Sequence, residues 1–353
     1  MPMNMKTLLG ACGIAVLALT PLEGQAKDWW PFEVQNVADG KSEAIDYVPL
    51  EQASKKWNIC VLFPHMKDSF WVAAAYGIIE EAKRLGVKVT ILEAGGYDQL
   101  PKQISQWDDC VASGAEAVVT GVISEAGMAP KFAEGLERGI PQVSFINAVI
   151  DAPLTARVRS EFDALGKASG DYLVKSLEPG AKEKVVAFPG PQGSGWADGY
   201  AKGFREALVG TNAELLEEKY GDTGVSIQLA LVEDALQTYP DMSVIWGTAP
   251  TVEAAIRAVA EAGLKGDIKI MASYENQEML DATMRGDVLG FASQYAVVQA
   301  RMGIDLAVRA LEGKDLLADT RVVPVVVTAK TASEFNMSDI LAPADWRPVF
   351  TVD

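Results

Sequence analysis

The chain has 353 residues, with 48 acidic and 31 basic side chains and a formal net charge of −17 at pH 7. Nucleic acids and anionic membranes bind clustered Lys and Arg, so this charge argues against both as partners. One histidine, His65, removes most histidine-based catalysis and any multi-histidine metal site. At ~100–200 residues per domain the length fits two globular domains, and the composition favours a binding protein over an enzyme.

Residues 1–26 have the pattern of a cleavable signal peptide. Lys6 supplies a positive charge, Leu8–Leu19 is an apolar run, and Gly24–Ala26 offers small residues for cleavage. The run is too short to span ~30 Å of hydrocarbon, so no membrane insertion is expected. A lipoprotein box ending at Cys12 is the alternative. We therefore expect a protein exported to the periplasm.

Cleavage of this segment leaves two cysteines, Cys60 and Cys110. An exported compartment permits a disulfide between them, although two buried thiols are the alternative, because free cysteine packs like a small hydrophobe. Cys60 opens the first predicted strand and Cys110 closes a predicted helix. In a right-handed crossover both ends lie at one edge of the sheet, so we predict a Cys60–Cys110 bridge.

After a polar, acidic N-terminal extension (27–52), short Val- and Ile-rich runs alternate with helical patterns. The predicted strands cover 58–63, 88–94, 117–122, 142–148, 184–190, 213–221, 243–248, 268–274 and 288–293. The predicted helices cover 71–85, 100–113, 165–177, 196–208, 225–239, 251–262 and 296–311. The strands are continuously apolar, as strands buried on both faces are, and the connections are long enough for helices.

This alternation predicts an α/β fold of doubly wound parallel sheets. About ten strands are too many for one small lobe, so we expect two lobes that face a cleft across a hinge. We assign 53–161 plus 293–321 to the N-terminal lobe. The C-terminal lobe and tail take 162–292 plus 322–353.

Aromatic residues stand at the carboxyl ends of several predicted strands, where parallel sheets bind ligands. They are Phe70, Trp71, Tyr97, Trp196, Trp246 and Tyr274. Each alone is better explained by packing, but together they favour an aromatic cage, with an acidic rim of Asp68, Glu161, Asp163 and Glu275. Such a cage suits a small methylated, cationic or zwitterionic nitrogen compound, because ring faces attract these groups by ~0.5–2 kcal/mol each. Arg is scarce in these loops, which disfavours carboxylate and phosphate ligands.

Other motifs have simpler explanations. Gly193, Gly195 and Gly199 imitate a dinucleotide fingerprint with one residue too many, so we interpret them as a tight turn at a helix start and expect no cofactor. We interpret His65 as a hydrogen-bonded surface residue. Asp68 is placed to cap the helix that starts near Trp71, which leaves it free to bind a ligand as well.

Six segments of the chain resemble the TorT family of periplasmic trimethylamine-N-oxide-binding proteins. They are WNICVLFP (57–64), KDSFW (67–71), EAGGY (93–97), NAVIDAP (147–153), FPGP (188–191) and WRPVF (346–350). The resemblance covers nearly all of 57–350. It implies a type I periplasmic-binding-protein fold with two lobes and three crossovers. It also implies a protein that docks on the periplasmic domain of a membrane sensor histidine kinase and transports nothing itself.

The resemblance also implies a set of ligand-contacting residues: Asp68, Phe70, Trp71, Tyr97 and Tyr274. Phe70 stands where relatives carry Tyr, and Phe162 stands where they carry a tryptophan from the second lobe. Trp196 and Trp246 stand where smaller residues are expected, so the pocket is reshaped. These departures keep the fold and the signalling role, and they leave another small methylamine open as the ligand.

Three functions are considered for a chain with these features. The first is a ligand sensor that regulates a histidine kinase in two-component signalling. The second is the binding subunit of an ABC importer for a small methylamine or sugar, which differs in its partner surface. The third, an exported enzyme, is disfavoured because no nucleophile–base pair and no metal cluster stand out in the sequence. A neighbouring gene for a sensor kinase would favour the first, and genes for a permease and ATPase the second.

Overall fold

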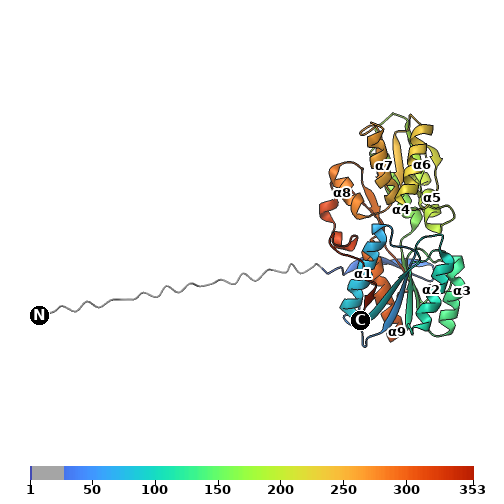
Figure 1. Cartoon of the computed structure of the whole chain (residues 1–353), viewed down its shortest axis with the longest axis vertical. Helices are drawn as coiled ribbons and strands as arrows, with labels where there is room; N and C mark the ends of the chain where they lie inside the picture. Colours follow the sequence, from blue (N-terminus) through green and yellow to red (C-terminus); the bar gives the residue numbers. More distant parts are fainter. Residues whose placement is uncertain (2–27) are drawn as a thin grey trace.

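The computed structural model describes Met1 and residues 28–353, so the expected signal peptide lies outside the described residues. Figure 1 shows two α/β lobes stacked along the long axis of the molecule. Each lobe has its own sheet, and both sheets are mainly parallel. The two-lobed α/β fold predicted from the alternation of strands and helices is therefore confirmed.

The first lobe is built on a sheet that has nine strands within residues 28–353. In spatial order they are β15 (Thr351–Val352), β4 (Lys88–Glu93), β3 (Asn58–Phe63), β5 (Ala117–Thr120), β6 (Gln142–Ile146), β7 (Ala156–Arg159), β13 (Asp319–Arg321), β1 (Phe32–Ala38) and β2 (Lys41–Tyr47). The strands from β4 to β13 pair in parallel, and β15, β1 and β2 are antiparallel additions at the two ends.

Helices cover both faces of this sheet. α1 (Ser69–Leu85) and α9 (Ala296–Glu312) pack on one face, and α2 (Leu100–Ala112) and α3 (Glu125–Glu137) pack on the other. The side chains of β3 explain the arrangement: Val61 and Phe63 belong to the core with α1 and α9, and Leu62 belongs to the core with α2 and α3. Successive strand residues point to opposite faces, so a strand that is apolar throughout needs helices on both.

The second lobe is built on a sheet of six strands in the part of the chain that the structure describes. Their order is β14 (Val325–Val327), β12 (Phe291–Ser293), β11 (Lys269–Ala272), β10 (Val244–Gly247), β8 (Glu183–Phe188) and β9 (Ala213–Glu218), and β14 is antiparallel. Its helices are α4 (Phe162–Lys175), α5 (Gly195–Leu208), α6 (Val225–Thr238), α7 (Ala249–Glu261) and α8 (Gln277–Arg285). Two 3₁₀ turns, at Ala332–Glu334 and Met337–Asp339, follow β14.

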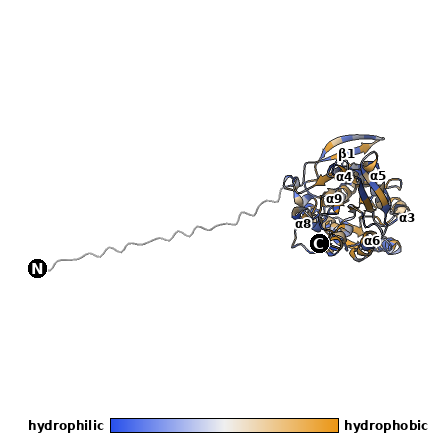
Figure 2. Cartoon of the chain, turned by 90° about the horizontal axis from the view of Figure 1, so that it is seen from above, coloured by the Kyte–Doolittle hydropathy of each residue, from blue (hydrophilic) through white to orange (hydrophobic). Residues whose placement is uncertain are grey.

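The ends of the chain correct two parts of the predicted lobe assignment. Residues assigned to an N-terminal extension form the hairpin β1–β2, which joins the first sheet through β13 and lies at the rim of the molecule in Figure 2. The tail expected with the second lobe instead returns to the first, where β15 pairs with β4. β15 is only two residues long and its partner β4 lies far away in the sequence, so no local pattern predicts this pairing.

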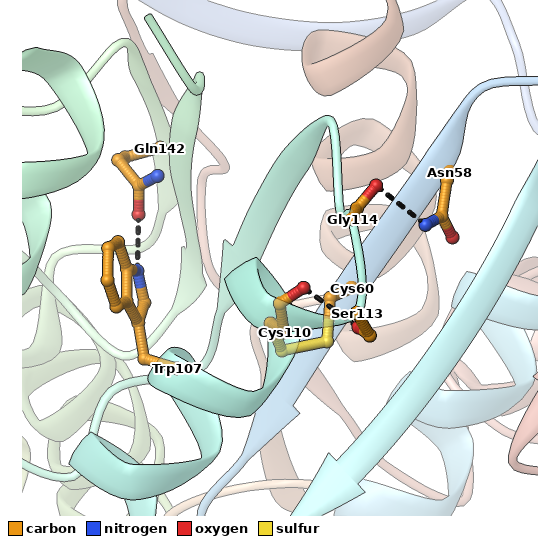
Figure 3. Close-up of a disulfide and its surroundings, with 7 residues drawn as sticks. All are labelled: Asn58, Cys60, Trp107, Cys110, Ser113, Gly114 and Gln142. Carbon is orange, nitrogen blue, oxygen red and sulfur yellow. Dashed lines mark hydrogen bonds between the residues drawn. A yellow bond between two sulfur atoms is a disulfide. The ribbon is translucent and has the colours of Figure 1, made fainter. Parts of the chain in front are cut away.

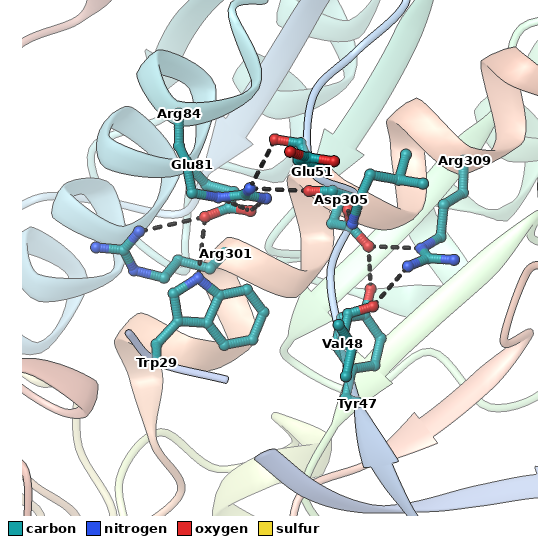
Figure 4. A network of polar contacts seen from close by, with 10 residues as sticks. Trp29, Tyr47, Val48, Glu51, Glu81, Arg84, Arg301, Asp305 and Arg309 are labelled. Carbon is teal, nitrogen blue, oxygen red and sulfur yellow. Dashed lines mark hydrogen bonds and ion pairs between the residues drawn. The ribbon is translucent and has the colours of Figure 1, made fainter. Parts of the chain in front are cut away.

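Two buried carboxylates attach the N-terminal segment to the first lobe (Figure 4). Glu81 on α1 accepts a hydrogen bond of 3.1 Å from the indole of Trp29, and Asp305 on α9 accepts one of 2.5 Å from the hydroxyl of Tyr47. Both carboxylates are fully buried, and Arg309 pairs with Asp305 at 2.6 Å. Since a buried charge is stable when it is paired, these contacts fix the N-terminal segment against the lobe.

The structure joins Cys60 on β3 to Cys110 on α2 in a disulfide, with Cα atoms 5.7 Å apart (Figure 3). Beside it, Asn58 donates a hydrogen bond of 2.9 Å to the carbonyl of Gly114. Both contacts bind the end of α2 to the start of β3, at the edge of the sheet away from the carboxyl ends of its strands.

None of the helices in the described part of the chain is long and apolar enough to cross a bilayer.

Candidate functional site

A cavity of about 320 Å³ lies where the two lobes meet, at the carboxyl ends of their strands. This is where ligands bind in open α/β sheets. Within residues 28–353, it is lined by His65, Asp68, Phe70, Trp71, Tyr97, Ile146, Asn147, Phe162, Trp196, Tyr200, Thr223, Tyr274 and Gln294.

The first-lobe wall is formed around the start of α1. Asp68 is the N-cap of this helix and accepts a hydrogen bond of 3.0 Å from the backbone N–H of Phe70, as the sequence predicts. The cap turns Phe70 and Trp71 towards the cavity. The hydroxyl of Tyr97, after β4, accepts a hydrogen bond of 3.1 Å from Asn147, after β6.

The backbone before Asn147 has an unusual conformation. Ile146 has a φ of 63°, in the left-handed region that a β-branched residue rarely adopts. The turn directs the amide of Asn147 to two acceptors, the hydroxyl of Tyr97 and the carbonyl of Val122 at 2.7 Å. Strain of this kind persists where surrounding contacts hold it, and here it orients a residue of the cavity.

The second-lobe wall depends on close packing of α4 and α5. Phe162 is the first residue of α4, and Trp196 and Tyr200 lie on the first turns of α5. A Cβ on Gly199 would lie 2.7 Å from the Cβ of Phe162, and one on Gly203 would overlap a backbone carbonyl of α4. These glycines therefore allow the two helices to bring three aromatic rings to one side of the cavity.

Direct contacts join the two walls. Tyr274 of the second lobe donates a hydrogen bond of 2.7 Å to Asp68 of the first, and its ring lies 5.2 Å from that of Phe70. Tyr97 and Trp196 face each other across the lobes with ring centroids 5.6 Å apart. The lobes are thus closed on the cavity.

Asp68 carries the negative charge of the cavity. Its carboxylate accepts hydrogen bonds from the backbone of Phe70, from Tyr274 and from Asn276 at 3.3 Å. Burial raises its pKa, and those three hydrogen bonds oppose the rise. Among the described residues no Lys or Arg forms an ion pair with it. A buried carboxylate without a cation favours a ligand that brings positive charge.

His65 is buried in the cavity wall, which corrects its interpretation as a surface residue. Burial lowers its pKa from 6.5 to about 4, more than the nearby charge of Asp222 raises it, so the ring is neutral at pH 7. Nε2 lies 3.4 Å from the hydroxyl of Thr223 in the other lobe.

Three buried polar atoms of the wall have no hydrogen-bond partner among the described residues. They are His65 Nδ1, Trp196 Nε1 and Gln294 Oε1. Leaving such a group unpaired costs about 1–3 kcal/mol, so these atoms mark places where a ligand can supply the missing partner.

The structure brings together seven of the eight ligand-contacting residues expected from the sequence. Asp68, Phe70, Trp71, Tyr97, Phe162, Trp196 and Tyr274 all line the cavity. Trp246 does not, and the expectation for it is corrected: it is fully buried in the second lobe, stacked on Phe204 at 4.1 Å, and donates to Ser169 at 2.9 Å.

Most of the expected acidic rim also lies elsewhere. Glu161 pairs with Arg159 at 2.8 Å, and Asp163 pairs with Lys202 at 2.8 Å. Glu275 is fully buried behind the cavity, where it accepts backbone hydrogen bonds at the start of α9. Asp68 alone of the four lines the cavity.

Sequence reasoning missed six lining residues: His65, Ile146, Asn147, Tyr200, Thr223 and Gln294. Tyr200 lies one helical turn after Trp196, on the same face of α5, and this spacing could have identified it. Asn147 and Gln294 directly follow strands, so the rule that selected the aromatic residues could have included them.

The cavity combines the faces of aromatic rings with the Asp68 carboxylate, which has no cationic partner among the described residues, and a few polar atoms. Among the described residues no group of His, Cys, Asp and Glu is placed to hold a metal ion. Ring faces attract methylated ammonium groups, and Asp68 adds a favourable field for positive charge. The cavity can therefore enclose a small cationic or zwitterionic amine.

Comparisons with known proteins agree with this fold. The family model of the periplasmic binding protein domain matches residues 59–315. The curated periplasmic protein TorT of Escherichia coli (strain K12) is 32% identical over 300 residues, which are 85% of this chain and 86% of that protein.

Two solved structures are also similar. A solute-binding protein of an ABC transporter from Bradyrhizobium sp. BTAi1, with bound bis-tris, is 42% identical with a TM-score of 0.80, over 92% of this chain and 99% of that one. TorT in complex with the TorS sensor domain in the presence of TMAO is 24% identical with a TM-score of 0.77, over 84% of this chain and 100% of that one. The second likeness supports the fold alone.

Proposed function

The chain belongs to the periplasmic binding protein family as a TorT-like member, and we propose that it binds trimethylamine N-oxide or a related small methylamine and regulates a membrane sensor histidine kinase. Members of this family bind solutes in the periplasm. Beyond solute binding, we propose that the ligand is a methylamine, that it is released without chemical change, and that a sensor kinase is the partner.

One observation carries the ligand class: Asp68 is a buried carboxylate without a cationic partner among the described residues, inside a cavity of aromatic rings. A carboxylate or phosphate ligand needs Arg or Lys. Among the described residues, no Arg or Lys lines the cavity. A methylated ammonium group satisfies both the rings and the charge.

One relative supports this class. The Bradyrhizobium protein holds bis-tris, which is a tertiary amine.

The test of the ligand class is calorimetric titration of the mature protein with a panel of methylamines, repeated for the tightest of them with Asp68→Asn. The asparagine can still cap α1, so the variant loses the charge and keeps the turn. We expect affinity to fall about 10- to 100-fold, ~1.4–2.7 kcal/mol. Asp109→Asn, which removes the same charge from an exposed position on α2, is the matched control and keeps wild-type affinity. Equal affinity of Asp68→Asn and wild type would contradict the proposal.

The partner is tested separately, by co-purification with the periplasmic domain of the cognate sensor kinase. The TorT likeness supports such a partner, and the acidic chain predicts that added salt weakens association if the facing surface is basic. We expect a complex at low salt. Failure to form one, with and without methylamine, would contradict the sensor role.

A second candidate is the binding subunit of an ABC importer. The observation that favours it is the 42% identity to the Bradyrhizobium protein, which is named as such a subunit. Both candidates require the same cavity and differ in partner. Stimulation of a reconstituted permease and its ATPase by the ligand-loaded protein, without binding to a sensor domain, would favour the importer.

A further inference from the structure

Two of the unpartnered polar atoms lie on the same side of the cavity, next to Tyr200. The ring of Trp196 is 5.6 Å from that of Tyr200, and the amide nitrogen of Gln294 donates a hydrogen bond of 3.2 Å to its hydroxyl. Trp196, from α5, and Gln294, from the segment between β12 and α9, are thus both neighbours of Tyr200, and each has one unpartnered polar atom, Nε1 and Oε1.

The two atoms need opposite partners. The indole N–H of Trp196 can only donate a hydrogen bond, and the amide oxygen of Gln294 can only accept one. A single ligand group that satisfies both must accept and donate, as a hydroxyl does. An N-oxide or carboxylate oxygen accepts only, and a methyl group does neither, so each would leave at least one buried atom unpaired.

The charged side of the cavity lies close to this pair. Tyr200 and Tyr274 have ring centroids 6.4 Å apart, and Tyr274 donates to Asp68. A nitrogen held between Asp68 and the rings therefore has the pair within the reach of a short arm. Phe162 and Trp196 complete the wall there.

We propose that the preferred ligand is a small amine cation that carries a hydroxyl on a short arm, with the nitrogen at Asp68 and the hydroxyl between Trp196 Nε1 and Gln294 Oε1. The inference rests on the proposed binding of a methylamine and names the substituent that distinguishes the ligand from trimethylamine N-oxide. Trp196 and Gln294 are then the residues that determine specificity.

The experiment compares three probes that differ only at the fourth substituent of a trimethylated nitrogen: tetramethylammonium, choline and trimethylamine N-oxide. Calorimetry on the wild-type protein is expected to give choline a dissociation constant at least about tenfold lower than that of either other probe, the effect of one added polar contact of ~1.4 kcal/mol. This comparison needs no variant, so it does not depend on the folding of one.

Trp196→Phe then tests the assignment of the hydroxyl site. The variant keeps a ring and loses the N–H. We expect the advantage of choline over tetramethylammonium to fall to less than about threefold, and this ratio is the readout because the smaller ring also changes the contact with the methyl groups that both probes share. Trp346→Phe, whose ring packs on Tyr76 outside the cavity wall, is the matched control and keeps the wild-type ratio.

The outcomes separate this inference from the proposed function. Binding of tetramethylammonium or trimethylamine N-oxide as tightly as choline overturns the inference and leaves the methylamine site standing. An unchanged choline advantage in Trp196→Phe also overturns it. Absence of binding by all three probes overturns the proposed ligand class, and the inference with it.

Discussion

At the scale of single residues, Trp71 has two roles. It lines the cavity, and it also packs edge-on against Phe63 at 5.5 Å and Phe145 at 6.0 Å, with 3% of its surface exposed. The contacts below the ring indicate that both binding and stability depend on Trp71.

We predict that Trp71→Ala weakens binding of the best methylamine by ~2–4 kcal/mol, about 30- to 1000-fold, since it removes cation–π attraction and buried area. It also lowers the free energy of unfolding by ~3–5 kcal/mol, as expected for a large core side chain. Calorimetry at a temperature where the variant is folded, verified by its thermal transition, measures the first effect. Trp346→Ala is the control, and unchanged affinity in folded Trp71→Ala would place the site elsewhere.

Glu275 titrates in an unusual range, because burial raises its pKa from 4.5 to about 7 against the opposing backbone hydrogen bonds from Gln294 and Ala296. The folded state therefore binds more protons than the unfolded state between these values. The free energy of unfolding falls as pH rises from about 4.5 to about 7, by up to ~3 kcal/mol from this group.

We predict that Glu275→Gln, which cannot ionise, gains stability relative to the wild type as pH rises through this window. Chemical unfolding of both proteins at pH 5 and pH 8 gives the difference. His65 has the opposite dependence, since its pKa of about 4 lies below the unfolded value of 6.5 and stability is lost as pH falls between them. The contribution of His65 is the same in both proteins, so it cancels when their free energies of unfolding are subtracted. A difference that stays constant with pH would show that Glu275 does not titrate there.

Trp196 and Trp246 in the second lobe show which cavity residues can be predicted from the sequence and which cannot. Trp196 and Trp246 both stand near strand ends, and the sequence predicts a cavity role for both. Trp196 follows its strand and points from α5 into the cavity, whereas Trp246 lies inside β10, with its ring on Phe204. Because a strand covered on both faces is apolar throughout, its sequence does not tell which face a given side chain occupies.

At the scale of elements, the pair α4–α5 sets the second-lobe wall. A Cβ on Gly170 would lie 2.6 Å from the Cβ of Ala207, and Cβ atoms on Gly166 and Gly203 would overlap backbone carbonyls of the facing helix. The sequence predicts both helices from their periodicity, to within three residues at each boundary. It does not predict their close approach, since nothing in a single sequence pairs glycines 30 or more residues apart.

We predict that Gly203→Ala lowers both the free energy of unfolding and ligand affinity, because the added methyl group separates α4 from α5 and moves Phe162 and Trp196. Overpacking of this kind costs ~1–3 kcal/mol or more. Gly195→Ala at the start of the same helix, where a Cβ meets nothing within 4 Å, is the matched control. Thermal unfolding and calorimetry measure the two effects. If Gly203→Ala has the stability and ligand affinity of the wild type, α4 and α5 can accommodate the added methyl group without moving apart.

The Cys60–Cys110 bridge connects two elements of the first lobe across 50 residues of chain. In the chain-entropy model a loop of this length is worth ~4 kcal/mol. We predict that protein from the periplasm contains no free thiols when denatured without reductant. The double replacement of both cysteines by Ala is expected to lower stability by up to this amount, while methylamine affinity is kept, since the bridge lies away from the cavity. Detection of two free thiols would contradict the bridge.

At the scale of the whole molecule, Trp196 Nε1, His65 Nδ1 and Gln294 Oε1 are buried in the closed arrangement without protein partners among the described residues. Each unpaired atom disfavours the closed form by about 1–3 kcal/mol, and water can satisfy it in an open form. Opposing this, the hydrogen bond from Tyr274 to Asp68 favours closure. A ligand that supplies the missing partners therefore shifts the population towards closed lobes.

We predict that small-angle scattering gives a larger radius of gyration for the free protein than for the protein saturated with its best methylamine. Tyr274→Phe keeps the ring and removes the donor to Asp68, so it should reduce this compaction and weaken binding roughly tenfold or more, as expected for a hydrogen bond to a charged group. Tyr172→Phe, on α4 and outside the cavity wall, is the matched control. If the radius of gyration is the same with and without ligand, the lobes do not move on binding. The sensor domain proposed as partner would then have to recognise the occupied cavity by local changes at its rim, because no change in overall shape would be available to report it.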